Sequence, residues 1–181
     1  LADAFDDDDP QLVLRESVVT DNFFDVLGVD PSLGRLFQSG DEVPWGANAA
    51  GGGVPIVLSH AAWERAFGGD SSVIGRHLAQ PKMGWTMIVV GVAPPGLDYP
   101  RGVEFWLPSN YANVDVVARL APNVTPEAAR KDFLGFLERD PEQARVLGVK
   151  SVGAQVHTLE DMVTGDARAA LIALAAAVTL L

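Results

Sequence analysis

The chain has 181 residues, of which 48% are hydrophobic and 20% charged, and its formal net charge at pH 7 is −11. The apolar content is sufficient for a packed core in one domain or two small subdomains, which excludes a disordered chain. The negative charge repels phosphate groups and excludes nucleic acid as a partner, and the absence of cysteine excludes disulfides, thiolate catalysis and cysteine-based zinc sites.

The N-terminal part of the sequence predicts a strand followed by a short helix. Residues 11–20 alternate between apolar and polar side chains, as in a half-buried strand. Residues 22–27 have apolar side chains at helical spacing, and Gly28 is typical of a helix end. The following Asp30-Pro31 pair predicts a second helical turn, which ends at Gly34.

A loop, a strand and a helix come next. Residues 38–53 are rich in Gly, Ala and Asn and predict a long mobile loop. The apolar run 54–58 predicts a short buried strand, and Ser59 is suited to cap the helix that follows. That helix ends at Gly68, and residues 71–75 predict one further turn.

The middle of the chain predicts more strands. Residues 76–80 and 85–92 have the pattern of a hairpin that turns at residues 81–84, and residues 103–107 predict another strand.

Beyond residue 109 the pattern changes to strand, helix and strand. Residues 114–120 alternate, Thr125 caps a helix that begins with Pro126 and ends near Arg139, and residues 151–158 predict the next strand. This order predicts a small α/β layer, to which the first strand of the chain adds.

The two ends of the sequence carry expectations of their own. The chain begins at Leu1 without a methionine or a signal-like stretch, which favours an excised fragment. Residues 169–181 are uncharged and apolar on every face, whereas a full membrane span needs about 20 apolar residues. This pattern favours the start of a transmembrane helix over a buried core helix.

Residue types that bind metals or phosphates are present, but not at the required spacing. His60, His77 and His157 stand apart from one another, without a zinc-binding motif. The acidic run 6–9 lacks the alternate ligands and the Gly of a calcium loop, and Gly51–Gly53 lacks the Lys of a phosphate loop. We therefore expect no catalytic residues, no metal site and no cofactor, and we interpret residues 6–9 as a solvated segment.

Three side chains are candidates for contacts. Arg35 and Arg76 each follow a glycine, and either could bind an anion or a partner. We favour a structural role, in which each arginine binds carbonyls at a helix end and neutralises nearby carboxylates. Trp45 is a large aromatic side chain in the predicted mobile loop, and it is our candidate for a partner contact.

Six side chains are predicted to be buried, because they recur at helix or strand spacing between turn signals. They are Phe24, Leu27, Trp63, Phe67, Val89 and Trp106.

Four ordered blocks within residues 17–181 resemble a known family. They comprise Phe23-Phe24, Leu27-Gly28, Pro31, Gly34-Arg35 and Phe37; Ile56 to Ser59, Trp63, Phe67 to Asp70 and Ile74-Gly75; Val89 to Pro94, Gly96-Leu97, Pro100 and Trp106 to Pro108; and Ala118 to Leu120, Pro122, Val124-Thr125 and Glu127-Ala128. Their order and spacing resemble the MacB-like periplasmic core domain of ABC transporter permeases, within the FtsX-like permease superfamily.

The resemblance implies an α+β fold in three parts. Residues 1–20 and 109–165 would form a porter-like α/β subdomain whose N-terminal part is missing. Residues 21–108 would form an inserted β-rich subdomain, and residues 166–181 the start of a transmembrane helix.

The resemblance also implies a non-catalytic role. The chain would be an extracytoplasmic domain of an inner-membrane permease, facing the periplasm or cell exterior, that relays ATPase-driven movement and contacts substrate or a periplasmic partner. Its partners would be a separate or fused ATPase and a second permease copy or half, with the C-terminal helix in the membrane. Two alternatives stay open: a membrane-anchored extracytoplasmic binding module unrelated to transport, and an enzyme of unknown type.

Overall fold

The structure is a computed structural model. It describes residues 3–6, 14–42, 53–80, 85–109, 117–140, 142 and 157–159. The chain divides into two compact units, Leu1–Arg119 and Leu120–Leu181, and we describe each by itself.

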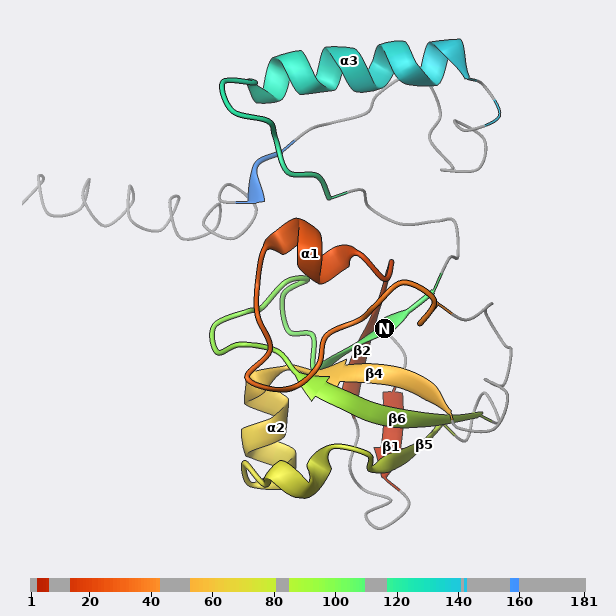
Figure 1. Cartoon of the computed structure of the whole chain (residues 1–181), viewed down its shortest axis with the longest axis vertical. Helices are drawn as coiled ribbons and strands as arrows, with labels where there is room; N and C mark the ends of the chain where they lie inside the picture. The colour runs from red at the N-terminus through yellow and green to blue at the C-terminus, as the bar shows by residue number, and fades with distance from the viewer. Residues whose placement is uncertain are drawn as a thin grey trace, which may run out of the picture. The chain divides into compact units, whose positions relative to one another are not determined.

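The first unit contains seven strands and three short helical segments among its described residues (Figure 1). The strands are β1 (Asp3–Asp6), β2 (Leu14–Val19), β3 (Leu33–Gly34), β4 (Val54–Leu58), β5 (His77–Gln80), β6 (Trp85–Val92) and β7 (Phe105–Pro108). The helical segments are α1 (Phe23–Leu27), α2 (His60–Phe67) and the 3-10 helix η1 (Ser71–Val73). The second unit contains helix α3 (Pro126–Arg139).

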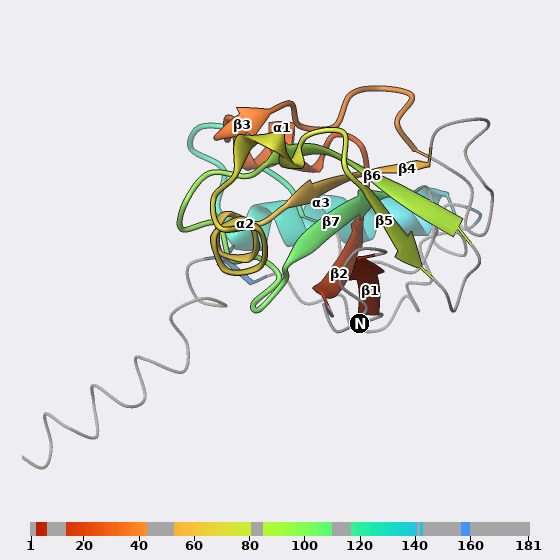
Figure 2. The ribbon, with the colours of Figure 1, turned by 90° about the horizontal axis from the view of Figure 1, so that it is seen from below.

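The strands form one mixed sheet that closes on itself. Their order is β3-β6-β4-β7-β2-β1-β5, and β5 pairs in addition with β6. All strands except β3 therefore belong to a closed ring, and β3 pairs with the C-terminal end of β6, beyond the residues that pair with β5 (Figure 2). The β2–β7 and β4–β6 pairs are parallel, and the other pairs are antiparallel. Closure leaves few strand edges open to other chains.

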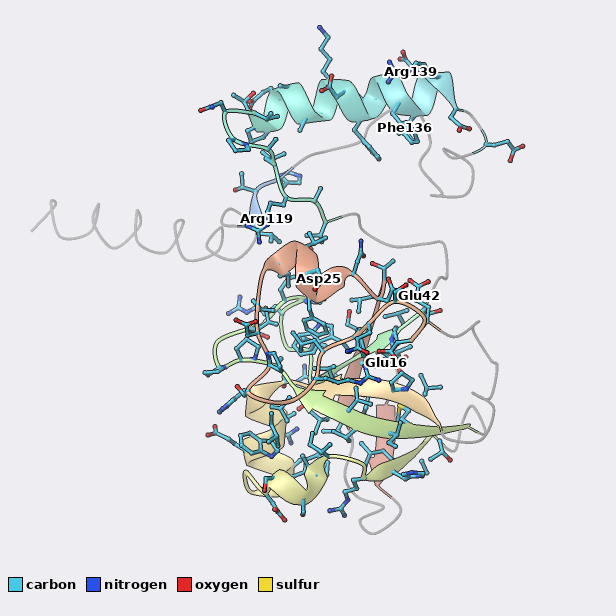
Figure 3. All side chains as sticks on the ribbon, viewed as in Figure 1. Glu16, Asp25, Glu42, Arg119, Phe136 and Arg139 are labelled. Atoms are coloured by element: carbon cyan, nitrogen blue, oxygen red, sulfur yellow. The ribbon has the colours of Figure 1, made fainter. Side chains whose placement is uncertain are left out.

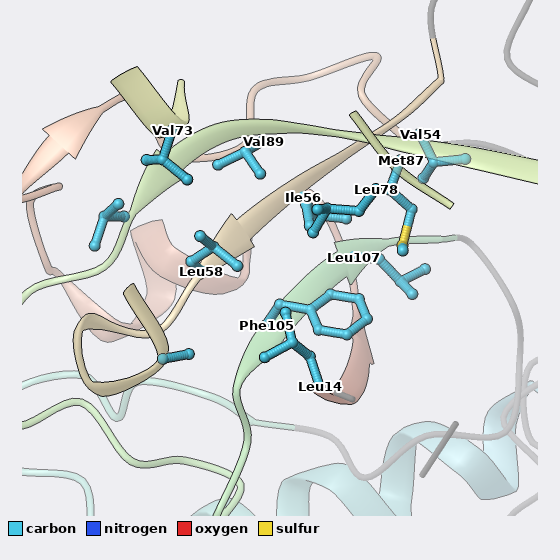
Figure 4. Packing of buried hydrophobic residues seen from close by; sticks show 12 residues of the cluster. Leu14, Val54, Ile56, Leu58, Val73, Leu78, Met87, Val89, Phe105 and Leu107 are labelled. Carbon is cyan, nitrogen blue, oxygen red and sulfur yellow. The ribbon is translucent and has the colours of Figure 1, made fainter. Parts of the chain in front are cut away.

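The two faces of this sheet are both buried. Ile56 and Leu58 of β4 belong to one hydrophobic cluster, and Val57 between them belongs to another. In β7, Phe105 belongs to the first cluster and Trp106 to the second, as the alternation of side chains along a strand requires. Figure 4 shows the first cluster, in which side chains from several strands point toward one another.

Most of the predicted elements are confirmed. The strand within residues 11–20, the strand at 54–58, the hairpin strands, the strand near 103–107 and the helix from Pro126 to Arg139 are all present. Ser59 Oγ accepts a hydrogen bond from the Ala62 N–H at 3.2 Å, and Thr125 Oγ1 accepts one from the Ala128 N–H at 3.2 Å. Both predicted N-caps are therefore correct.

The second helical turn predicted before Gly34 is wrong. Leu33–Gly34 is strand β3, and the flanking N–H groups of Ser32 and Arg35 donate to the carbonyls of Val92 and Val90 at 2.8 and 3.0 Å. Pairing with β6 therefore overrides the local Asp-Pro signal.

The strand predicted at residues 114–120 is absent from its described part. Residues 117–120 have no regular secondary structure, and residues 114–116 lie outside the described part of the chain. Val117 packs against the second cluster, and the Arg119 guanidinium donates a hydrogen bond to α1. This segment is therefore held by side-chain contacts instead of by strand pairing. Of the strand predicted at 151–158, only His157 and Thr158 are described, and neither is in a strand.

Burial is as predicted for half of the six candidate core residues. Phe24, Val89 and Trp106 are at most 1% exposed. Leu27, Trp63 and Phe67 are only partly buried, although they pack against the two clusters. The reason is that these three lie on the short helices α1 and α2, each of which packs one side against a cluster and keeps the other side in water.

The domain division and the membrane helix stay predictions. About half of residues 109–165 and all of residues 166–181 lie outside the described part of the chain. Among the helices that are described, none is long and apolar enough to cross a membrane.

Candidate functional site

The side chain predicted to contact a partner cannot be placed. Trp45 lies outside the described residues, as do its neighbours from 43 to 52. The start of the predicted mobile loop is held by hydrogen bonds, however. The Gly40 N–H donates to Asp21 Oδ2 at 3.3 Å, and the Asp21 N–H donates to Glu42 Oε1 at 3.2 Å.

Arg35 binds a carboxylate inside the protein. Its guanidinium forms a bidentate pair with Asp41, with Nη1–Oδ2 and Nη2–Oδ1 distances of 2.5 and 3.1 Å, and it also donates to the Leu36 carbonyl. The Gln38 N–H donates to Asp41 Oδ2 at 2.9 Å. Partial burial raises the pKa of Asp41, but the hydrogen bonds from Arg35 and Gln38 and the Arg35 charge outweigh it, so the net pKa is lowered. Arg35 therefore neutralises a nearby carboxylate, as predicted for its structural role.

Arg76 also contacts other parts of the fold. Its guanidinium carbon lies 5.4 Å from the centre of the Phe67 ring, which is a cation–π contact. Its N–H and carbonyl bind Val73 and Val89, which joins η1 to β6. Both Gly-Arg pairs therefore lie alongside β6 and hydrogen-bond to its backbone.

The Trp63 and Phe67-to-Asp70 block forms a tight corner after α2. Gly68 and Gly69 have φ values of +63° and +72°, which glycine adopts without strain. The Trp63 indole donates to the Asp70 carbonyl at 2.9 Å across this corner. Asp70 in turn accepts bonds from the N–H and hydroxyl of Ser72, which lower its pKa and cap η1. The block is a structural unit.

The Trp106 block belongs to an aromatic cluster beneath α1. The Trp106 ring lies 5.4 Å from Phe24 and 6.5 Å from Phe23, and its indole donates to the Tyr99 carbonyl at 3.0 Å. Phe24 also lies 5.3 Å from Phe37. These contacts satisfy the one polar atom of a buried tryptophan, as expected for a core residue.

Glu104 was not singled out from the sequence, yet it joins three elements. One carboxylate oxygen accepts a hydrogen bond from the Arg15 N–H at 2.8 Å and lies 3.8 Å from Arg15 Nε, and the other pairs with Arg65 of α2. Its own N–H donates to the Arg15 carbonyl, and its carbonyl accepts from Ser59. No local sequence pattern indicates the role of Glu104, because its partners lie 89 and 39 positions away in the sequence.

The described residues bring no metal-binding set together. No group of three or more His, Asp or Glu side chains in this part of the chain could hold a metal ion. His60 lies on α2 beside Glu64 and Trp63, and His77 lies in β5, so these two are separate. Figure 3 shows the side chains of the described residues. Among the charged ones, Arg35 pairs with Asp41, and Arg65 pairs with Glu104.

The fold and these motifs define a class of protein: an α+β domain with a mixed sheet, in which the ordered sequence blocks build the scaffold. The family model of the MacB-like periplasmic core domain matches residues 4–135, and the chain belongs to this family. The family is the periplasmic domain of ABC transporter permeases, a class that is generally non-enzymatic.

Two solved structures have a similar fold. One is the periplasmic region of MacB from Actinobacillus actinomycetemcomitans, with a TM-score of 0.52 and 15% identity over 76% of this chain. The other is a domain of a predicted permease from Porphyromonas gingivalis, with a TM-score of 0.50 and 18% identity over 90% of this chain. The chain spans 62% of the first structure and 76% of the second. A comparison with curated protein sequences found no match.

Proposed function

We propose that this chain is the periplasm-facing domain of an inner-membrane ABC permease, and that it relays ATPase-driven movement to a substrate or periplasmic partner without catalysing a reaction. The observation that carries the proposal is the family match over residues 4–135. The permease would act as a dimer or pseudo-dimer with a separate or fused ATPase, held in the membrane by the helix that begins near residue 166.

The polar contacts of the first unit support a mechanical role. Arg35–Asp41 joins the two ends of one loop, and Glu104 binds both β2 and α2. Partly buried charge pairs with several hydrogen bonds fix the geometry of the elements that they join. A unit with a closed sheet, two buried faces and such ties moves as a rigid body, which is what a relay requires.

The test uses a strain that lacks the permease gene and shows a transport-dependent growth defect. We would compare complementation by the full-length permease with complementation by a version from which this domain is removed, and measure ATP hydrolysis in the membranes of both strains. We expect the domain-less permease to retain hydrolysis and lose complementation. Full complementation without the domain, or turnover of any substrate by the isolated domain, would contradict the proposal.

The partner contact proposed for Trp45 needs its own comparison. Trp45→Ala should weaken cross-linking of the permease to periplasmic proteins and leave ATP hydrolysis unchanged. Phe136→Ala is the matched control, because Phe136 is a large aromatic side chain that is 42% exposed on α3. A loop-shortening variant should remove only residues 43–52, since Asp41 and Glu42 hold other parts of the fold. Equal cross-linking of wild type and Trp45→Ala would remove Trp45 from the interface.

A further inference from the structure

Two arginines share one carboxylate at the surface of the first unit. Arg15 lies in β2 and Arg65 in α2, and Glu104 immediately precedes β7. Arg15 Nε is 3.8 Å from Glu104 Oε2, and Arg65 Nη2 forms an ion pair with Glu104 Oε1. Among the described residues, no other carboxylate pairs with two arginines. Two guanidiniums thus converge on a single acceptor.

Most donors of these two guanidiniums have no acceptor within the protein. The Arg15 and Arg65 side chains are each 56% exposed, whereas Glu104 is 15% exposed. In the described part of the chain, Glu104 is the one acceptor that binds either side chain. Arg35 differs, because both oxygens of Asp41 and a carbonyl occupy its donors. A guanidinium presents five N–H donors in one plane, which suits the two oxygens of a carboxylate, so the shared pair can accept a second one.

The surrounding fold holds Arg15 in place. Its N–H donates to Glu104 Oε2 at 2.8 Å, and its carbonyl accepts a hydrogen bond from the Glu104 N–H at 2.8 Å. A Cβ built on Gly102 would lie 3.3 Å from Arg15 Nη1, so the guanidinium lies beside the backbone of this glycine. Donors that are already positioned lose less conformational entropy when they bind a further group.

Other charged residues lie on the same elements. Arg101 and Asp98 belong to the loop before β7, and Asp3 of β1 is the register partner of Arg15. Among the described residues, neither arginine of the shared pair forms an ion pair with a carboxylate other than Glu104. The surface is therefore distinguished by its available donors and not by a large net charge.

We propose that Arg15 and Arg65 form a docking surface for an acidic segment of a partner protein, one of whose carboxylates binds both guanidiniums as Glu104 does. Recognition of anionic lipid uses clusters of about 4–8 basic residues, more than this surface has. Exposed ion pairs add little affinity by themselves, so a free anion is held weakly, whereas a protein segment adds contacts around the pair. The use of this surface in transport rests on the proposed function, and its binding of carboxylates does not.

The first test follows the arginine side-chain Nε–Hε signals of the full chain by NMR. The probe is a short peptide with adjacent glutamates, and the same peptide with glutamines is the control. We expect the glutamate peptide to shift the signals of Arg15 and Arg65 and to leave that of Arg130, which is exposed on α3, in place. The glutamine peptide should shift none of them. Unmoved signals of Arg15 and Arg65, or equal shifts at all three arginines, would overturn the proposal.

Variants separate this surface from a general effect of charge. Arg15→Gln and Arg65→Gln should each weaken binding of the glutamate peptide by about twofold to fivefold, as expected for exposed ion pairs. Arg130→Gln and Lys131→Gln make the same charge change at exposed positions on α3 and should leave it unaltered. A thermal melt checks the fold of each variant, and Arg65→Gln, on a surface helix, serves if Arg15→Gln does not fold. Equal weakening by the α3 variants would overturn the proposal.

Two further titrations identify the source of the carboxylate or phosphate. Inorganic phosphate should shift the Arg15 and Arg65 signals only at higher concentration than the glutamate peptide does. Vesicles that contain anionic lipid should not bind in a way that depends on these arginines. Phosphate binding as tight as that of the peptide would identify a free-anion site, and arginine-dependent vesicle binding without peptide binding would identify a lipid contact. Either result overturns the docking surface.

Complementation separates this surface from the relay. In the full-length permease, the combined Arg15→Gln and Arg65→Gln variant should reduce complementation and leave ATP hydrolysis intact. Normal complementation by this variant, when removal of the whole domain abolishes complementation, would show that transport does not use the surface and would overturn that part of the proposal. If removal of the whole domain also leaves complementation normal, the proposed function itself has failed.

Discussion

Gly34 of β3 and Gly91 of β6 are register partners, and neither position can carry a methyl group. A Cβ on Gly34 would overlap the Val90 carbonyl oxygen, and one on Gly91 would overlap the Arg35 carbonyl oxygen. Two of the blocks that resemble the family therefore contain glycines for one and the same reason, the close approach of the backbones of β3 and β6 in their antiparallel pair.

Gly91→Ala should destabilise the protein by about 1–3 kcal/mol, because its methyl group meets backbone that cannot move aside. The measurement is the free energy of unfolding from urea denaturation. Gly135→Ala is the control, since it lies inside α3 with its nearest atom 3.8 Å from the new Cβ. There the same substitution should be neutral or stabilise by about 0.5–1 kcal/mol. Equal effects at both sites would refute the crowding at Gly91.

Trp106→Ala should cost about 3–5 kcal/mol, as for other fully buried aromatic side chains. Trp63→Ala should cost less, because Trp63 is only partly buried, although its spacing in the sequence predicted a buried side chain. Urea denaturation of the two variants gives the comparison. A larger loss for Trp63→Ala than for Trp106→Ala would contradict the placement of these side chains.

The pair Arg35–Asp41 should make stability depend on acid pH. The folded-state pKa of Asp41 is lowered, so its contribution is fully present above the unfolded-state pKa of about 4 and is lost as pH falls through the folded-state value. Asp41→Asn should therefore be less stable than wild type at pH 7, and the difference should shrink below about pH 4. In an Arg35→Ala background the pH dependence of this difference should be reduced. A difference that stays constant from pH 7 to pH 2.5 would contradict the assignment.

Local patterns predicted the elements whose signals are local. The apolar run 54–58, the hairpin pattern of residues 76–92 and the caps at Ser59 and Thr125 were enough to predict those strands and helices. They could not predict β3, whose two residues are a strand only because Gly34 meets Gly91. Nor could they predict β1, since Asp3–Asp6 is acidic and unlike a strand, and pairs with β2 and β5 from opposite sides. Strand β1 includes the backbone of Asp6, and our interpretation of residues 6–9 as a solvated segment stays a prediction, since residues 7–9 lie outside the described part of the chain.

The polar contacts were harder still to predict. Arg35 was singled out because it follows a glycine, and its partner Asp41 is only six positions away. Glu104 and Arg119 have partners that are distant in the sequence, so neither the charge nor the spacing of nearby residues indicates them. These contacts could be predicted only with knowledge of how the sheet closes, because closure determines which distant segments of the chain become neighbours.

Deleting residues 169–181 should leave the fold of the first unit intact and improve solubility without detergent. The reason is that this segment is apolar on all faces, as the start of a membrane helix would be. The measurements are the thermal melt and the soluble yield of the two forms. Unfolding of the first unit on deletion would identify the segment as a core helix.

The central claim is that this domain moves with the ATPase cycle, and one distance tests it without knowledge of the substrate. Ala61→Cys, on exposed α2, gives one spin label per copy in a dimer of the full-length permease from which any native cysteines have been removed. The label-to-label distance would be measured in the presence of the ATPase, first without nucleotide and then with ATP and vanadate. A shift of the distance between the two states, lost when the ATPase cannot hydrolyse or bind ATP, is the result that the relay predicts. One unchanged distance distribution through the whole cycle would contradict it.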